Sequence, residues 1–142
     1  AFHIYEELEK YSLPVLFHCG VELSSKGEVR SSPDRILNVL NKFPNLKVIC
    51  AHMGGYLMWN EALEKLGGKN VYFDTSDSIR EMGDDLRNEF FAKHGFDKIL
   101  FGSDFPLEYP KTEINFIKSL NISEENKEKI LGGNIKKLLN LP

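Results

Sequence analysis

The chain has 142 residues, a net charge of −3 and no basic cluster, so nothing in its charge favours binding to nucleic acid or to an anionic membrane. Hydrophobic residues make up 42% and charged residues 27%, a balance typical of globular rather than disordered chains. No apolar run reaches the ~20 residues that span a bilayer, and residues 1–10 lack the layout of a signal peptide. We therefore expect one globular domain over residues 1–142.

Two cysteines, Cys19 and Cys50, lie inside apolar runs. Because neither has a partner at metal-finger spacing and two cysteines do not form a disulfide framework, we expect reduced thiols and a cytoplasmic protein. The sequence starts at Ala1 rather than at a methionine, as a processed product or a fragment would.

Four short apolar runs predict β-strands buried on both faces. They cover Pro14–Cys19, Leu46–His52, Val71–Thr75 and Lys98–Asp104. The runs begin at residues 14, 46, 71 and 98, which are 32, 25 and 27 residues apart. A closed (β/α)₈ barrel of about 250 residues uses roughly 31 residues per strand–helix unit. The chain therefore holds about four such units.

Helical patterns separate and follow the strands. They predict helices over Phe2–Tyr11, Pro33–Phe43, Tyr56–Leu66, Asp84–His94, Lys111–Leu120, Glu124–Leu131 and Ile135–Leu141. Ser32 and Ser123 are expected to be N-caps, and Gly132-Gly133 is expected to break the helical pattern before the last helix. This alternation predicts an α/β fold with a parallel sheet.

The polar stretch Glu22–Ser32 is longer than most connections between a strand and a helix. It predicts either a cover over a site or a surface excursion. Four units also leave the sheet with two unpaired edges, which proteins normally avoid. Three arrangements stay open: a complete open sheet, a barrel whose first half is missing, or two copies paired edge to edge.

Polar residues stand at the carboxyl ends of three predicted strands, namely His18, His52 and Asp104. Ligands of parallel α/β folds bind at this edge. Strand alternation places His52 on the same face as Val48 and Cys50. In a flat sheet the first and fourth strands would be about 14 Å apart, so the three side chains meet only if the sheet curves. Imidazole and carboxylate groups suit Zn²⁺, Mn²⁺ or Fe²⁺, and a bound ion can turn water into hydroxide near neutral pH.

Other candidate residues have simpler explanations. We expect His3 and His94, which lie in helical stretches, to be solvated. Asp74 is expected to hydrogen-bond the loop that follows its strand. Gly54-Gly55 is expected to form a tight turn, with an anion cradle at the next helix as the less favoured alternative.

Several motifs resemble those of amidohydrolase-related, metal-dependent hydrolases. The matching segments are residues 14–20 (PVLFHCG) for the fifth strand, 43–55 (FPNLKVICAHMGG) for the sixth, 70–76 (NVYFDTS) for the seventh, 99–106 (ILFGSDFP) for the eighth and 129–134 (KILGGN) for the closing helix. The resemblance covers essentially the whole chain. It implies the second half of a (β/α)₈ TIM barrel, with strands five to eight.

The resemblance also implies roles for three residues. His18 would be a metal ligand, and His52 would be either a second ligand or the acid–base group beside the metal-bound water. Asp104 would bind the metal and take the proton from the attacking water. The implied cofactor is a divalent metal, expected to be Zn²⁺. The His-x-His pair that the family carries after its first strand has no counterpart in this sequence, so the chain alone is expected to bind metal poorly.

The leading functional hypothesis is hydrolysis of a small amide, ester or lactone by a metal-activated water. The alternative on the same scaffold is non-oxidative decarboxylation, with His52 as proton donor and with Lys26 or Arg30 as candidate anchors for the substrate carboxylate. A third hypothesis is a non-catalytic half barrel that forms homo-oligomers through its open edges. An open sheet that binds phosphate at Gly54-Gly55 is disfavoured, because the sequence has no phosphate loop.

Overall fold

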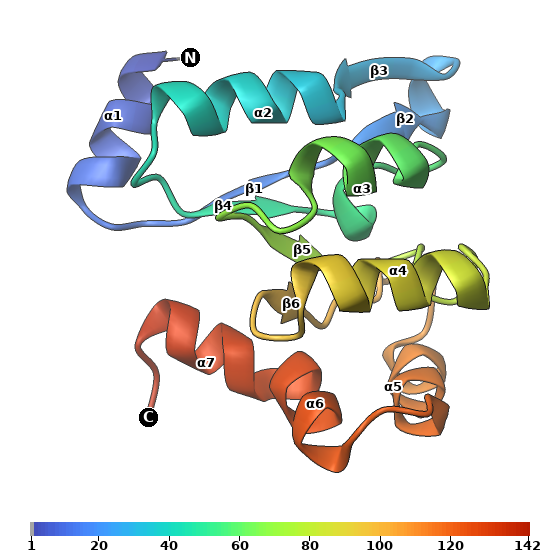
Figure 1. The fold of residues 1–142 in the computed structure, drawn as a ribbon. Helices are drawn as coiled ribbons and strands as arrows, with labels where there is room; N and C mark the ends of the chain where they lie inside the picture. Colours follow the sequence, from blue (N-terminus) through green and yellow to red (C-terminus); the bar gives the residue numbers. More distant parts are fainter. Residues whose placement is uncertain (1) are drawn as a thin grey trace.

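A four-stranded parallel sheet forms the centre of the fold (Figure 1). The computed structural model describes residues 2–142. The sheet has the order β1-β4-β5-β6, and the extended elements and short turns are β1 (Val15–Phe17), β2 (Gly20–Glu22), η1 (Leu23–Ser25), β3 (Glu28–Ser31), β4 (Val48–Cys50), η2 (His52–Gly54), β5 (Tyr72–Asp74) and β6 (Ile99–Leu100). The predicted α/β class and the four parallel strands are confirmed, although each strand is shorter than its apolar run.

Helices follow the strands in the predicted order. They are α1 (Phe2–Lys10), α2 (Pro33–Lys42), α3 (Trp59–Leu66), α4 (Asp84–His94), α5 (Pro110–Ser119), α6 (Glu124–Glu128) and α7 (Asn134–Leu139). Ser32 and Ser123 cap α2 and α6 as predicted, since each hydroxyl accepts a hydrogen bond from the backbone N–H three residues further on. Among residues 2–142, no helix combines the length and the apolar character that a membrane crossing would need.

The predicted break at Gly132-Gly133 is wrong. Lys129–Gly133 forms one π-helical turn that joins α6 to α7, and the backbone N–H of Asn134 bonds to the carbonyl five residues earlier. Gly133 has φ −60° and ψ −45°, which are ordinary right-handed helical values. The two glycines therefore do not use their conformational freedom to leave the helix.

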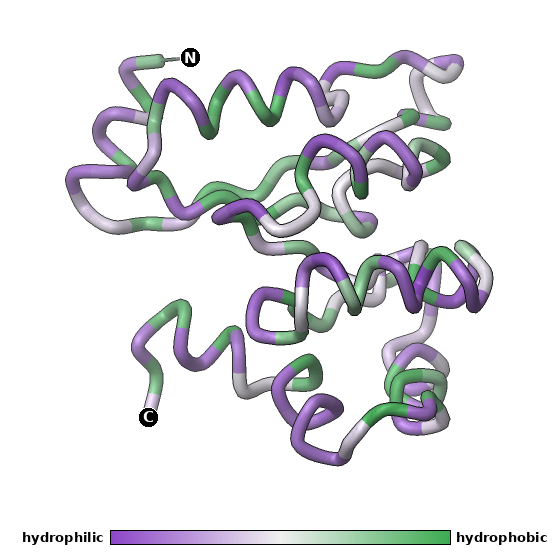
Figure 2. The backbone as a smooth tube through the Cα atoms, in the orientation of Figure 1, coloured by the Kyte–Doolittle hydropathy of each residue, from purple (hydrophilic) through white to green (hydrophobic). Residues whose placement is uncertain are grey.

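One face of the sheet packs against helices and forms the main core. Val48, Cys50, Phe73 and Ile99 point to this face and are fully buried, and Phe90 of α4 packs on them. Figure 2 shows hydrophobic and hydrophilic segments alternating along the helices, as expected for helices with one buried side. We call this the outer face, because it carries all of the helices except α7.

The opposite, inner face is covered only in part. Ile135 and Leu138 of α7 pack on Ile49 and Leu100 and bury them, and Figure 1 shows α7 well separated from α2 and α3. Leu16 of the edge strand β1 lies beside Ile49 in the sheet but is 61% exposed. On the inner face, α7 therefore covers β4 and β6, whereas β1 is left exposed.

The predicted facing of the second strand is wrong. Alternation predicts that Val48 and Cys50 share a face with His52, but both belong to the outer core, and Ile49 points inward. The strand ends at Cys50, and His52 and Met53 both have left-handed backbones, with φ of 58° and 50°. The His52 ring therefore reaches the inner side through a backbone turn and not through strand alternation.

The polar stretch Glu22–Ser32 belongs to an antiparallel hairpin of β2 and β3 rather than to an irregular loop. Gly20 enters the hairpin with φ 94°, and a Cβ there would clash with the backbone nitrogen of Tyr56. Only glycine fits this crossing, which directs the hairpin back over the carboxyl edge of the sheet.

Candidate metal centre

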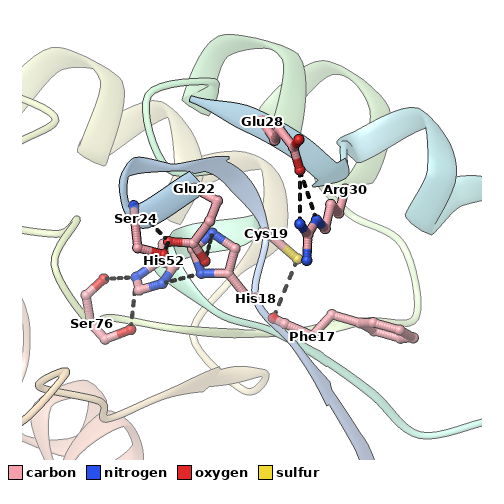
Figure 3. Close-up of polar contacts among 9 residues, drawn as sticks. All are labelled: Phe17, His18, Cys19, Glu22, Ser24, Glu28, Arg30, His52 and Ser76. Atoms are coloured by element: carbon pink, nitrogen blue, oxygen red, sulfur yellow. Dashed lines mark hydrogen bonds and ion pairs between the residues drawn. The ribbon is translucent and has the colours of Figure 1, made fainter. Parts of the chain in front are cut away.

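The rings of His18 and His52 lie against each other at the carboxyl edge of the sheet (Figure 3). His18 follows β1, and His52 begins the turn after the neighbouring strand β4. Nδ1 of His18 is 3.1 Å from Nε2 of His52. The side chain of His18 is 40% exposed, whereas His52 is only 5% exposed. The structure thus brings two of the three predicted site residues into contact.

Asp104 follows β6 and has a left-handed backbone, with φ 59°. Together with His18 and His52 it lines two clefts, with volumes of about 330 and 410 Å³. Over residues 2–142, however, no three His, Cys, Asp or Glu side chains are grouped so that they could hold one metal ion. The three predicted residues therefore share their clefts, but they do not by themselves form a complete ligand set.

The hairpin forms one wall of the 330 Å³ cleft. Val21, Glu22, Leu23 and Ser24 line it, and Tyr56, from the segment between η2 and α3, also contributes to the wall. Of the two alternatives for the polar stretch, the structure supports the cover over a site.

Glu22, which the sequence analysis did not single out, lies next to His18. Its Oε2 is 3.8 Å from Nε2 of His18. Hydrogen bonds from the side chain and backbone of Ser24 lower the pKa of the Glu22 carboxyl group, so it is an anion at neutral pH. Its position four residues after His18 was the available signal, but only the turn at Gly20 brings the two side chains together.

The clefts are acidic. Glu22, Asp77 and Asp104 all line the 330 Å³ cleft, and no Lys or Arg is among the described residues that line either cleft. Carboxylates that converge with no compensating cation create a negative potential. The site therefore favours a bound cation over a bound anion.

A carboxylate behind His52 holds the surrounding backbone. Oδ1 of Asp74 accepts hydrogen bonds from the backbone N–H groups of His52, at 3.1 Å, and Ser76, at 3.0 Å. The predicted bond between Asp74 and its following loop is therefore confirmed. Gly54, with φ 83°, lies in the predicted tight turn after His52.

Other residues that could titrate or bind metal lie elsewhere. His3 is exposed as predicted, but the prediction that His94 is solvated is wrong. The His94 ring packs on Phe73 with 4.5 Å between centroids, and burial lowers its pKa to about 4. Cys19 and Cys50 are free thiols in the outer core, and burial raises the pKa of Cys50. A buried neutral thiol is a poor metal ligand.

The chemistry of the donors fits a divalent cation. Metal–imidazole bonds are about 2.0–2.1 Å long, so two ring nitrogens 3.1 Å apart, as in His18 and His52, can bind the same ion. Asp104 supplies a carboxylate to the same clefts. In the part of the chain that the structure describes, His18 and His52 are thus close enough to share an ion, and Asp104 lines the same clefts without completing a ligand set.

Comparisons with known proteins show which proteins the chain resembles. A gamma-resorcylate decarboxylase of Polaromonas sp. (strain JS666 / ATCC BAA-500) is 26% identical over an alignment of 125 residues, and the match covers 72% of this chain and 37% of that protein. A solved dihydroxybenzoic acid decarboxylase from Polaromonas sp. JS666, with bound manganese and the inhibitor 2-nitroresorcinol, superposes with a TM-score of 0.70 at 21% identity, over 98% of this chain and 53% of the other. An uncharacterized TIM-barrel protein from Bordetella bronchiseptica gives a TM-score of 0.76 at 23% identity, over 98% and 50%.

The chain spans little more than a third of the curated relative and about half of these solved chains. Its four strand–helix units therefore correspond to half of a (β/α)₈ TIM barrel, as the sequence predicts. The model of the amidohydrolase family matches residues 1–141. The chain belongs to the amidohydrolase family.

Proposed function

We propose that this chain carries the metal-binding half of a metal-dependent, non-oxidative decarboxylase that acts on a small hydroxylated aromatic acid. The observation that carries the proposal is the contact between His18 and His52 beside Asp104 in an acidic cleft. The similarity to a gamma-resorcylate decarboxylase supports the reaction class. Hydrolysis of a small amide, ester or lactone is the second candidate.

In this proposal His18 and Asp104 hold a divalent metal, His52 lies beside the ion as the acid–base group, and the remaining ligands come from the other half of the barrel. The bound metal supplies polarisation of the substrate oxygens. Manganese is favoured over zinc, since a solved neighbour holds manganese and nitrogen and oxygen ligands accept both.

His52 is the group that moves the proton. Decarboxylation breaks the bond between the ring carbon and the carboxylate, releases carbon dioxide and leaves an electron pair that a proton must take. Nε2 of His52 faces His18 at the cleft, and its ring is almost fully buried, so its position is fixed. A fixed imidazole can accept a proton from the substrate and return it to the ring carbon.

Lys26 and Arg30 are the anchors that the sequence predicts for the substrate carboxylate. Neither residue lines either of the two clefts at His18 and His52. Arg30 is 73% exposed and lies 2.8 Å from Glu28, with which it forms an ion pair. In a decarboxylase the metal or the other half of the barrel must therefore hold the carboxylate. A neutral ester, amide or lactone needs no such anchor, which is the observation in favour of hydrolysis.

The decisive assay uses the whole enzyme that contains this chain, loaded with Mn²⁺. We expect gamma-resorcylate to release carbon dioxide and, in D₂O, to give a product with one deuterium on the ring carbon that carried the carboxylate. A parallel panel of aryl esters, amides and lactones tests the second candidate. Hydrolysis of that panel without carbon dioxide release from any aromatic acid would overturn the decarboxylase assignment.

Variants of the same enzyme test the individual roles. His18→Ala and Asp104→Ala should each remove the bound metal, as measured by elemental analysis. His52→Ala should keep the metal in a mononuclear site and lose turnover. Arg30→Ala is the matched control and should change neither quantity, because Arg30 lies outside both clefts. Unchanged metal content in His18→Ala or Asp104→Ala would contradict the ligand assignment.

A further inference from the structure

The hydrogen bonds around the His52 ring determine which of its nitrogens carries a proton. Nδ1 is 3.0 Å from the backbone carbonyl oxygen of Ser76 and 3.1 Å from the Ser76 hydroxyl, as Figure 3 shows. A carbonyl oxygen can only accept, so Nδ1 must be the donor. In a neutral ring Nε2 then has no hydrogen and presents a lone pair. That lone pair faces Nδ1 of His18 at 3.1 Å.

Ser76 is held in turn by Asp74. The Ser76 hydroxyl donates a hydrogen bond to Oδ1 of Asp74, and the Ser76 backbone N–H donates to the same oxygen at 3.0 Å. Because its hydrogen goes to Asp74, the Ser76 hydroxyl can only offer a lone pair to His52. The hydrogen bonds therefore all point the same way: His52 donates to Ser76, and Ser76 donates to Asp74.

The same carboxylate oxygen also fixes the main chain of His52. Oδ1 of Asp74 accepts the His52 backbone N–H at 3.1 Å, at the point where the chain turns out of β4 with φ 58°. Asp74 ends β5, the strand next to β4. One side chain thus connects two neighbouring strands and sets both the backbone and, through Ser76, the ring of His52.

We infer that Asp74 and Ser76 are positioning residues that hold His52 in the tautomer with its proton on Nδ1, so that Nε2 is the nitrogen available for proton transfer. The inference rests on the proposed function of His52. The reason is general: the working nitrogen of a histidine is set by the hydrogen bond that the other nitrogen makes.

Long-range ¹H–¹⁵N correlation spectra of the ¹⁵N-histidine-labelled, metal-free chain test the inference. The chain has four histidines, so a His52→Gln variant assigns the signal. The wild type should show a protonated Nδ1 and an unprotonated Nε2. Ser76→Ala keeps the backbone carbonyl as an acceptor but loses the hydroxyl that is tied to Asp74, so it should shift the tautomer population only in part. Ser76→Thr, which keeps the hydroxyl, should show the wild-type pattern.

Asp74→Ala is a second variant for the case in which Ser76→Ala does not fold. It removes the acceptor of three hydrogen bonds and should lose the tautomer, whereas Asp74→Asn, whose amide oxygen can still accept them, is the control and should keep it. In the active enzyme, Ser76→Ala should lower kcat about 10- to 100-fold with a smaller change in KM. A proton on Nε2 in the wild type, or an unchanged tautomer in both Ser76→Ala and Asp74→Ala, would overturn the inference. An enzyme that fails to decarboxylate would instead overturn the proposed function, because the spectra do not depend on turnover.

Discussion

The two faces of the sheet are built differently. On the outer face, Val48, Phe73 and Ile99 are fully buried under helices. On the inner face, α7 covers only part of the sheet, and Leu16 is 61% exposed. Most residues that line the clefts, among them His18 and Asp104, follow the strands at the carboxyl edge of the sheet.

The outer face therefore supplies most of the stability of the fold, and the carboxyl edge beside the inner face holds the side chains that could carry out chemistry. The outer core is complete within this chain, so it can hold the strands in place. The inner face is covered only in part, and the clefts open beside it. We therefore expect substitutions on the outer face to change the free energy of unfolding and substitutions at the clefts to change binding and turnover.

The largest expected effect is on the outer face. Phe73→Ala should lower the free energy of unfolding by about 3–5 kcal/mol, because Phe73 is fully buried and packs on Phe90 with 5.7 Å between ring centroids. Phe105→Ala is the control and should stay within about 0.5 kcal/mol of the wild type, since Phe105 is 66% exposed. Urea unfolding of both variants measures the difference. A loss of less than 1 kcal/mol for Phe73→Ala would show that the outer core is not the main source of stability.

The next effect concerns the entry to the hairpin. Gly20→Ala combines a left-handed backbone with a clash against the backbone of Tyr56 and should cost about 2–3 kcal/mol. Gly27→Ala is a matched control, because Gly27 also has a positive φ, of 80°, but its nearest neighbour to a new Cβ is 3.9 Å away. It should cost about 1 kcal/mol. If thermal unfolding gives the same loss of stability for Gly20→Ala and Gly27→Ala, the close approach between Gly20 and Tyr56 does not contribute to stability.

A third effect depends on pH. Burial holds the pKa of His94 at about 4 in the folded chain, against about 6.5 when unfolded. Between these values the unfolded chain binds more protons, so stability falls as pH drops from 6.5 to 4 and then levels off. The accessible part of the ring limits the loss to roughly 2 kcal/mol. His94→Leu should flatten this part of the pH–stability curve, and the exposed His3→Gln should not. An unchanged slope in His94→Leu would rule out His94 as the cause.

Much of the fold could be predicted because it depends on local patterns. The runs that contain Val48–Cys50 and Ile99–Leu100 are apolar on both sides, and Ser32 before Pro33 marks a helix start, so strands and helices follow from neighbouring residues alone. The hairpin was not predicted, because its antiparallel pairing joins polar residues whose apolar contacts are few. Its decisive feature is the crossing at Gly20, which depends on a segment far away in the sequence.

The site could be predicted only as a set of residues. His18, His52 and Asp104 stand at strand ends, which the sequence shows directly. The alternation argument placed His52 on the same face as Val48 and Cys50, which is wrong, because the left-handed turn after β4 cannot be predicted from alternation. Ser76 was missed because its role depends on the ring of His52, which is 24 residues away. A contact between residues this far apart in the sequence becomes visible only in the folded chain.

The smallest expected effect belongs to the inner face and decides whether that face stays open in solution. Leu16→Ala should change the free energy of unfolding by no more than about 0.5 kcal/mol, because most of the Leu16 side chain is exposed. If a second copy of the chain covers the inner face, burial of a leucine is worth about 1.5–3 kcal/mol, and the loss would grow with protein concentration. Urea unfolding at two concentrations, with sedimentation velocity, separates the outcomes. A small, concentration-independent loss would leave the contrast between the faces intact, whereas a large, concentration-dependent loss would mean that a partner copy completes the inner face.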